Sequence, residues 1–187
     1  ANMQIPLIVR QPGQIPAARR SDHTINEFDL LPTILDYVGL GDRRIADTPG
    51  RSHAALFRGG PAGEEQPVFF EYITTRVIQT RDWKYTKRLL DAPDELYDLA
   101  KDPGETRNLA DDPAHAAVIG SLGAQLTAFF ERYADPRWDV WRGGTAKAVL
   151  VYGNRNRRFA GHFPGWTPPV TVKSVPFRDR GSPGAGQ

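Results

Sequence analysis

Residues 95–110 read ELYDLAKDPGETRNLA, a segment in which acidic side chains crowd around one tyrosine and a Pro-Gly pair. Such a segment fits three structures: an ion-binding loop, a catalytic pair of acids, or a strand that ends in a turn. A 12-residue calcium loop needs oxygen ligands at alternating positions and a glycine at the sixth position. The run from Asp98 to Thr106 lacks that spacing, because Pro103-Gly104 places the turn elsewhere. The ion-binding interpretation is therefore disfavoured.

The alternation of side chains along residues 95–99 decides between the other two structures. A catalytic pair requires two carboxylates that converge on one cleft. In a strand, successive side chains point to opposite faces, so Leu96 and Asp98 share one face while Tyr97 and Leu99 share the other. The segment therefore predicts a short strand that ends in an Asp-Pro-Gly turn, followed by an Asn-Leu entry into a helix.

The residues on both sides of this segment predict a small α+β unit. The segments PVFFEYI (67–73), RVIQT (76–80) and WKYTKRL (83–89) are rich in β-branched and aromatic residues and are separated by short polar breaks, which is typical of an antiparallel meander. A tight turn is predicted at Arg81-Asp82. Residues 114–133 then predict an amphipathic helix, which begins near Pro113 with Asp111 or Asp112 as its N-cap. The apolar face of this helix is expected to carry Val118, Leu122, Leu126 and Phe129.

The first 40 residues predict a different arrangement. Ile5–Val9 is a short continuous apolar run, which is typical of a strand buried on both faces of a parallel sheet. In FDLLPTILDYVGLG (28–41) apolar residues recur at helical spacing, with Asp29 at the first turn and Gly39 where a left-handed stop belongs. A strand followed by a helix predicts the edge of an α/β layer.

Composition and charge limit the classes of protein to which the chain can belong. Its 187 residues suffice for one ordinary domain or two small pieces, and an apolar content of 40% is that of a globular protein. It contains no cysteine and no apolar run that could span a bilayer. Because it opens within a strand-like run, we expect a fragment of a longer protein. Residues 1–136 carry 15 basic and 20 acidic residues, a net charge of −5, whereas residues 137–187 carry nine and two, a net charge of +7.

Four segments, taken in order, resemble the C-terminal portion of the sulfatases, members of the alkaline-phosphatase-like superfamily. ELYDLAKDPGETRNLA resembles a segment near the sulfatase C-terminus, and RVIQTRDWKYTKRL (76–89) resembles the strands of the small C-terminal subdomain. IPLIVRQPGQI with INEFDLLPTILDYVGL (5–40) resembles the last strand and helix of the catalytic domain, and DTPGRSHAALFRG (47–59) resembles the linker. The resemblance covers about residues 3–133, and no single motif within it is diagnostic.

The resemblance implies an α/β fold with three parts. Residues 1–58 would form the edge of the alkaline-phosphatase-like sheet domain with its strand, helix and linker. Residues 59–134 would form a small antiparallel α+β subdomain with a C-terminal helix. Residues 135–187 would form an irregular tail that is basic, aromatic and rich in glycine and proline.

The resemblance also implies the chemistry of the whole protein. Sulfatases hydrolyse sulfate esters with a formylglycine nucleophile and a divalent cation, usually calcium, held by oxygen ligands. In the family these groups lie upstream of the strand that opens this chain. The expected partners are therefore an upstream catalytic domain and an anionic sulfate-ester substrate, and we expect no catalytic residue and no metal ligand within residues 1–187, which alone should be inactive.

Two groups of residues invite functional interpretations. Ser174, Pro176 and Arg178 in SVPFRDRGSPG (174–184) match part of the sulfatase signature Cys/Ser-x-Pro-x-Arg, but Pro183 replaces the expected Thr or Leu and the match lies at the wrong end of the chain, so we treat it as coincidental. The histidines at positions 23, 53, 115 and 162 have no metal-ligand spacing, and solvated surface positions are the simpler expectation, with a role at a cleft edge open for His53 and His162.

The basic tail is the candidate for substrate binding. The cluster NRNRR (154–158) is flanked by Trp141, Phe159 and Trp166, a pattern that also suits nucleic acid, but the body is acidic and carries no nucleic-acid fold signature. We expect the tail to cover an anionic-substrate cleft or to contact another subunit in a homo-oligomer, with no nucleic-acid or membrane partner. The predicted substrate-binding residues are Arg155, Arg157, Arg158 and His162.

Two alternative functions remain open at this point. A phosphonate or phosphate ester hydrolase of the same superfamily would share these segments, since only the upstream nucleophile discriminates. A non-catalytic module that binds a polyanion through the tail is the alternative from a different class. The sequence gives neither the substrate, nor the oligomeric state, nor the cellular compartment.

Overall fold

The computed structural model describes residues 5–41, 43, 47–72, 74–89 and 92–143. The chain divides into two compact units, residues 1–135 and residues 136–187. In the part of the second unit that is described, a short 3-10 helix, η3, spans Val140–Arg142. No helix among the described residues is long and apolar enough to cross a membrane.

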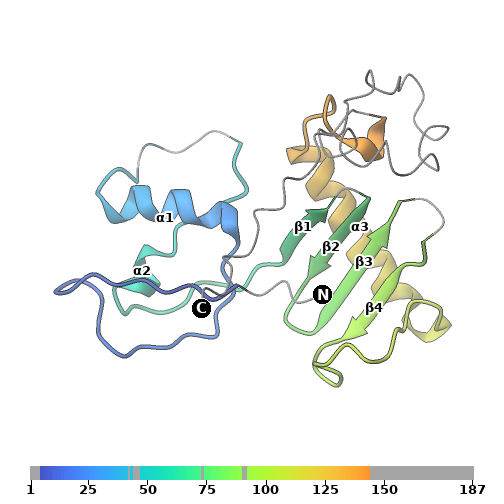
Figure 1. The fold of residues 1–187 in the computed structure, drawn as a ribbon, viewed down its shortest axis with the longest axis horizontal. Helices are drawn as coiled ribbons and strands as arrows, with labels where there is room; N and C mark the ends of the chain where they lie inside the picture. The colour runs from blue at the N-terminus through green and yellow to red at the C-terminus, as the bar shows by residue number, and fades with distance from the viewer. Residues whose placement is uncertain (1–4, 42, 44–46, 73, 90–91, 144–187) are drawn as a thin grey trace, which may run out of the picture. The chain divides into compact units, whose positions relative to one another are not determined.

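The first unit contains the predicted antiparallel meander (Figure 1). Its strands follow one another in the sheet in sequence order, and Phe69, Ile78, Tyr85 and Leu96 lie opposite one another across it. At the turn between the second and third strands, the Thr80 N–H donates to the carbonyl oxygen of Trp83 at 2.8 Å, which confirms a tight connection through Arg81-Asp82. The strands are β1 (Val68–Tyr72), β2 (Thr75–Gln79), β3 (Trp83–Arg88) and β4 (Glu95–Asp98).

One long helix, α3 (Ala116–Tyr133), packs against one face of this sheet. A 3-10 turn, η2 (Pro113–His115), leads into it, and the Asp112 carboxylate caps that turn by accepting from the Ala114 N–H at 3.0 Å. The predicted apolar face needs one correction, because Phe130 is buried while Phe129 is half-buried. The core is formed by Ile78, Tyr85, Leu96, Leu109, Leu122, Leu126 and Phe130.

Phe129 is half-buried and packs beside the core, where Phe69 is its ring partner. Its ring stacks on that of Phe69 with centroids 3.8 Å apart and an interplanar angle of 5°. The buried row on α3 is Leu122, Leu126 and Phe130, which are spaced by four residues each and therefore share one face of the helix.

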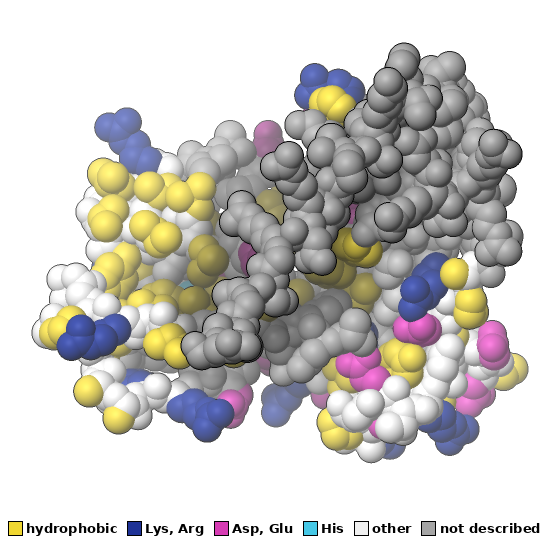
Figure 2. Space-filling model, viewed as in Figure 1, with side chains coloured by type: hydrophobic (Ala, Val, Ile, Leu, Met, Phe, Trp, Pro, Cys, Tyr) yellow, Lys and Arg dark blue, Asp and Glu magenta, His cyan; other side chains and the backbone are white. Residues whose placement is uncertain are grey.

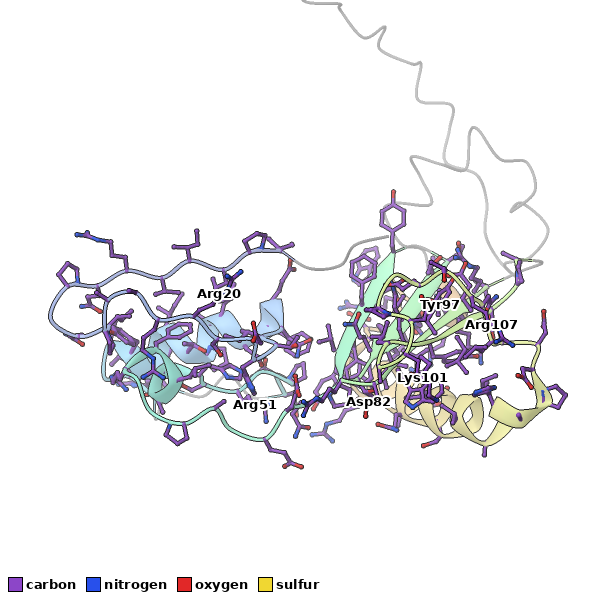
Figure 3. All side chains as sticks on the ribbon, turned by 90° about the horizontal axis from the view of Figure 1, so that it is seen from below. Arg20, Arg51, Asp82, Tyr97, Lys101 and Arg107 are labelled. Atoms are coloured by element: carbon purple, nitrogen blue, oxygen red, sulfur yellow. The ribbon has the colours of Figure 1, made fainter. Side chains whose placement is uncertain are left out.

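The segment 95–110 is a strand and a capped turn, as its sequence predicts. Leu96 and Asp98 are buried, and Tyr97 lies on the side of the sheet away from α3 (Figure 3). The Asp102 carboxylate accepts from the N–H groups of Thr106 and Arg107, at 2.7 and 2.9 Å. The hydrogen bond from Arg107 contributes most to lowering the pKa of Asp102 below its ordinary value.

The end of this segment hydrogen-bonds to the outer edge of β4 rather than leading straight into a helix. The Leu109 N–H donates to the carbonyl oxygen of Leu96 at 2.8 Å, and the Asn108 side chain accepts from the Leu96 N–H at 2.9 Å. Asn108 also donates through its amide to the carbonyl oxygen of Asp94 at 3.1 Å. These contacts occupy the outer edge of β4, so the polar residues of the segment serve the fold.

The N-terminal part contains the predicted helix but not the predicted strand. A 3-10 turn, η1 (Glu27–Asp29), leads into α1 (Leu30–Tyr37), which stops before Gly39 with φ +78°, and α2 (Ala54–Phe57) follows. Residues 5–9 lie outside any helix or strand and are exposed. A strand needs a neighbour for its N–H and C=O groups, and the described residues place none of β1–β4 beside this run.

The uncovered apolar side chains of this part form a surface that we call the N-terminal apolar surface. It is visible as the hydrophobic side chains gathered over α1 (Figure 2). A contiguous exposed apolar area promotes association with other surfaces. Its members, on α1 and directly after it, are Leu30, Leu31, Ile34, Val38 and Leu40, and Ile5, Leu7, Ile8 and Val9 are exposed as well.

Replacing Leu31 and Ile34 by lysine is expected to reduce self-association of the chain, because both side chains are exposed on α1 and added charge opposes apolar contact. The measurement is light scattering after gel filtration over a range of protein concentrations. The matched control places two lysines at Thr127 and Ala128, which are exposed on α3. A wild-type chain that stays monomeric and unfolds cooperatively would contradict the prediction.

Candidate functional site

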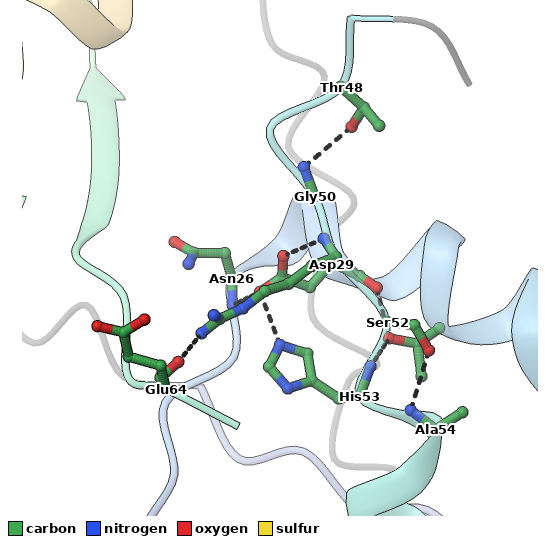
Figure 4. A network of polar contacts seen from close by, with 10 residues as sticks. Asn26, Asp29, Thr48, Gly50, Ser52, His53, Ala54 and Glu64 are labelled. Carbon is green, nitrogen blue, oxygen red and sulfur yellow. Dashed lines mark hydrogen bonds and ion pairs between the residues drawn. The ribbon is translucent and has the colours of Figure 1, made fainter. Parts of the chain in front are cut away.

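A buried carboxylate, Asp29, organises the most connected polar cluster of the N-terminal part (Figure 4). It lies at the start of α1 and is 2% exposed. Its Oδ2 accepts from the Asn26 N–H at 2.8 Å and lies 3.2 Å from His53 Nε2. Its Oδ1 accepts from the Arg51 N–H at 3.0 Å. One side chain thus joins the beginning of α1 to the loop that precedes α2.

Hydroxyl groups reinforce this connection. The Thr33 hydroxyl donates to the carbonyl oxygen of Asp29 at 2.6 Å and accepts from the His53 N–H at 3.0 Å. The Ser52 hydroxyl donates to Asp36 Oδ2 at 2.5 Å and accepts from the Ala54 N–H at 3.1 Å. The loop before α2 therefore donates hydrogen bonds to three side chains on or beside α1, those of Asp29, Thr33 and Asp36. These bonds fix the position of the start of α2.

Close backbone approach adds a requirement for glycine at position 50. A Cβ atom there would lie 2.0 Å from the carbonyl oxygen of Phe28, a distance that no side chain can adopt without moving the backbone. Pro32 of α1 would be the next neighbour at 3.0 Å. The GRSH segment (50–53) can therefore lie on the start of α1 only because its first residue has no side chain.

The chemistry of this cluster is that of a structural connection. His53 is 4% exposed, which leaves it little access to a substrate, and the Asp29 carboxylate already interacts with three donors. The Ser52 hydroxyl is engaged by Asp36 rather than by His53. A nucleophile activated by a histidine base needs those two side chains within hydrogen-bond reach. The cluster therefore holds the loop in place.

The three histidines that the structure describes differ from the solvated surface positions expected for them, and His162 lies outside the described residues. His53 is buried, and the half-buried His23 ring lies 5.2 Å from it, centroid to centroid. His115 is also half-buried, with its ring 5.6 Å from that of Trp83. The expectation of solvated histidines is wrong for His53 because its partner, Asp29, lies 24 residues earlier and is not visible in local spacing.

Burial lowers the pKa of His53 below 6.5, against the opposing effect of Asp29. The unfolded chain therefore binds a proton at this position at a higher pH than the folded chain does. Stability from this group is fully present above pH 6.5 and is lost as the pH falls from 6.5 towards the lowered folded pKa.

We therefore expect His53→Gln to show a weaker loss of stability than the wild type when the pH falls through this window. The measurement is urea unfolding at several pH values, with the slope of stability against pH as the readout. Thr127→Gln, at an exposed position on α3, is the control and should leave that slope unchanged, because it removes no titratable group. Identical slopes for the wild type and His53→Gln would contradict the assignment.

The residues that the sequence predicted for substrate binding lie outside the described residues. These are Arg155, Arg157, Arg158 and His162, and the Ser174, Pro176 and Arg178 match lies outside them as well. Within the described part of the chain, no group of three or more His, Asp or Glu side chains is placed to hold a metal ion.

Sequence reasoning missed the Asp29 cluster, although it named Asp29 as a cap. Asp29 is the N-cap residue of α1 by position, but its side chain accepts no N–H of that helix and accepts instead from the Asn26 N–H before it. The longer-range role has one sequence signal, a Gly-Arg-Ser-His segment (50–53) that follows the Asp-Leu-Leu-Pro-Thr segment (29–33) after 16 intervening residues. The sequence alone does not indicate that these two segments are in contact, so this pattern could not be interpreted from it.

Comparison with known proteins defines the class to which the chain belongs. Its relatives are sulfatases, members of the alkaline-phosphatase-like superfamily. Residues 1–132 match the family described as N-sulphoglucosamine sulphohydrolase, C-terminal. The chain belongs to this family.

Individual relatives agree with this assignment. The chain is 33% identical over 142 residues to a Delta 4,5-hexuronate-2-O-sulfatase of Bacteroides thetaiotaomicron, covering 70% of this chain and 29% of that protein. It is 30% identical over 144 residues to a choline-sulfatase of Rhizobium meliloti, covering 73% and 26%. The chain thus spans less than a third of the length of these relatives.

A solved structure agrees at the level of the fold. A phosphonate monoester hydrolase from Silicibacter pomeroyi superposes with a TM-score of 0.52 and 24% identity. The match covers 67% of this chain and 28% of that one.

Proposed function

We propose that residues 1–187 are the C-terminal part of a sulfuric ester hydrolase. The observation that carries the proposal is the family match over residues 1–132, with sulfatases among the relatives that are at least 30% identical. In this proposal the Asp29 cluster and the four-stranded sheet with α3 are architecture, and the reacting groups belong to an upstream catalytic domain.

The proposed reaction needs a nucleophile and a cation that this part of the protein does not supply. In the proposal, a formylglycine attacks the sulfate ester and a divalent cation, calcium, polarises it, and both are held upstream. A hard cation takes oxygen ligands and withdraws charge from the reacting group. In the proposal, residues 1–187 contribute to the shape and stability of the protein.

The first test is an assay of the 187-residue chain with an aryl sulfate and added calcium. No turnover above the uncatalysed rate is expected. Ser174→Ala is included because Ser174 belongs to the one partial match to the formylglycine signature that the sequence contains. Turnover by the chain that this substitution abolishes would overturn the proposal.

The tail is proposed to bring anionic substrate to the protein. Residues 137–187 carry a net charge of +7, and the arginines at 155, 157 and 158 are its densest cluster, with His162 close by in sequence. Clustered positive charge raises the local concentration of an anion, and salt screens the effect over about 8–10 Å at physiological ionic strength. Contact with another subunit is the second role proposed for the tail.

One experiment on the complete protein distinguishes the two proposed roles of the tail, substrate binding and subunit contact. With Arg155, Arg157 and Arg158 replaced by glutamine, we expect KM to rise at low salt and the difference to shrink at high salt. The matched control replaces Arg10, Lys87 and Arg107, three basic residues of the first unit. A changed oligomer mass with unchanged KM would favour subunit contact, and no change in either would contradict both roles.

A further inference from the structure

Two histidine rings of the N-terminal part lie against each other beside the Asp29 carboxylate. The ring centroids of His23 and His53 are 5.2 Å apart, and the rings are tilted by 58°. His23 belongs to the segment that precedes η1, Asp29 to η1 itself, and His53 to the loop that precedes α2. The exposed fractions of His53 and Asp29 are 4% and 2%. A titratable ring is therefore buried where three segments of the chain meet.

The hydrogen bond to Asp29 determines which nitrogen of His53 carries the proton in the neutral ring. His53 Nε2 lies 3.2 Å from Asp29 Oδ2, and a carboxylate can only accept, so Nε2 holds the proton. An added proton must then bind at Nδ1, the ring nitrogen that points away from Asp29 (Figure 4). No described residue accepts a hydrogen bond from that atom. Protonated His53 would thus be a buried charged donor without a protein acceptor at Nδ1.

The charges around the His53 ring also disfavour a further positive charge. The groups that act on this ring are Asp29 of η1, His23 of the preceding segment and Arg51 of its own loop. The charges of Asp29 and Arg51 cancel while both rings are neutral, so a proton on either ring leaves one positive charge uncompensated. The Arg51 guanidinium donates to the carbonyl oxygen of Glu64, which carries no countercharge. A buried uncompensated charge is costly, and burial accordingly lowers the pKa of His53.

The contact between this loop and α1 is held by few hydrogen bonds. The Arg51 N–H donates to Asp29 Oδ1, and the His53 N–H donates to the Thr33 hydroxyl, both at 3.0 Å. None of these residues belongs to the core cluster between the sheet and α3. Regions that few contacts hold in place open at a lower cost than the fold as a whole. The loop can therefore separate from α1 while the sheet and α3 stay folded.

We propose that residues 48–53 form a pH-sensitive latch, which is closed on α1 while His53 is uncharged and opens when His53 takes up a proton. Opening gives Nδ1 access to water and separates the ring from that of His23. Because the open form binds the proton more tightly, acidification from neutral pH populates it and a return to neutral pH closes the latch. The latch does not depend on the proposed sulfatase function, since it concerns contacts within residues 23–53 only.

Amide hydrogen exchange of the 187-residue chain, followed by NMR at pH 7.5 and pH 5.5, tests the latch directly. Protection is compared after correction for the intrinsic exchange rate at each pH. The Arg51 and His53 amides should lose protection about tenfold, because a histidine of ordinary pKa, about 6.5, raises the population of the open form by about that factor. The Leu109 amide, which donates to the Leu96 carbonyl oxygen, is the internal control and should keep its protection.

Three variants identify the group that takes up the proton. His53→Gln keeps an N–H group that can reach Asp29 but does not titrate, and it should make the protection of Arg51 equal at the two pH values. His23→Phe keeps a ring beside His53 without a titratable group and should retain the tenfold loss. His115→Gln removes a histidine next to α3, far from the latch in sequence, and as the matched control should also retain the loss.

Several results would overturn the latch. Equal protection of the wild-type Arg51 amide at both pH values would mean that the loop does not open, and an equal loss at Leu109 would mean that the whole chain unfolds. A loss that persists in His53→Gln, or disappears in His23→Phe, would place the proton elsewhere. A measurement that needs no variant is the NMR titration of the His53 ring in the wild type, whose midpoint should lie below pH 6.5. A midpoint at or above that pH would contradict the proposal.

Discussion

Replacing Leu96 by alanine is expected to lower the free energy of unfolding by about 2–5 kcal/mol, the range for a leucine truncated in a core. Leu96 is completely buried at the centre of the cluster formed by the sheet and α3. Its N–H and carbonyl groups also hold the chain at Asn108 and Leu109. Truncation leaves a cavity at the point where β4, the following turn and α3 meet. The measurement is urea unfolding followed by tryptophan fluorescence.

Two controls give this result its meaning. Leu99→Ala makes the same truncation three residues later, where the side chain is only half-buried, and should cost less. Asp111→Asn changes an exposed acid near the end of the same segment and should stay within about 0.5 kcal/mol. The architectural role of residues 95–110 would be contradicted if the chain bound a metal ion and if Asp98→Asn or Glu105→Gln abolished that binding while leaving the fold intact.

Replacing Asp29 by alanine is expected to detach the loop before α2 from α1. The substitution leaves the N–H groups of Asn26 and Arg51 without an acceptor and removes the partner of His53. An unpaired buried donor costs about 1–3 kcal/mol, so the total loss should be on the order of 3 kcal/mol. The measurement is amide hydrogen exchange, in which the Arg51 amide should lose its protection.

Asp36→Ala is the matched control, because it removes a carboxylate from the same helix. Asp36 accepts from Ser52, and its ion pair with Arg58 spans 3.7 Å between partly exposed side chains, so the cost should be smaller. Asp29→Asn keeps the shape of the side chain and should retain part of the Arg51 protection. Unchanged exchange at Arg51 in Asp29→Ala would contradict the role assigned to this cluster.

The elements that could be predicted from the sequence are those whose information is local. Strand alternation places Leu96 and Asp98 together, and both are buried in the structure. The cap at Asp112 and the stop at Gly39 are chosen by residue types within a few positions. The antiparallel meander follows because its connections are short enough to join only neighbours.

What could not be predicted depends on residues far away in the chain or on missing neighbours. The contact between Asp29 and His53 spans 24 residues, and no local pattern announces it. Residues 5–9 have the composition of a buried strand, but a strand exists only beside another strand. On α3, which of Phe129 and Phe130 is buried in the core depends on Phe69, because the Phe69 ring stacks on that of Phe129.

The most direct test of the sulfatase assignment is the release of sulfate and of phosphonate products by a longer protein that carries residues 1–187 at its C-terminal side. The two esters should be compared at equal concentration with added calcium, and the 187-residue chain should be assayed beside it. We predict turnover of the sulfate ester by the longer protein, with a clear preference over the phosphonate ester, and none by the chain alone. Turnover of the phosphonate ester without turnover of the sulfate ester would contradict the assignment.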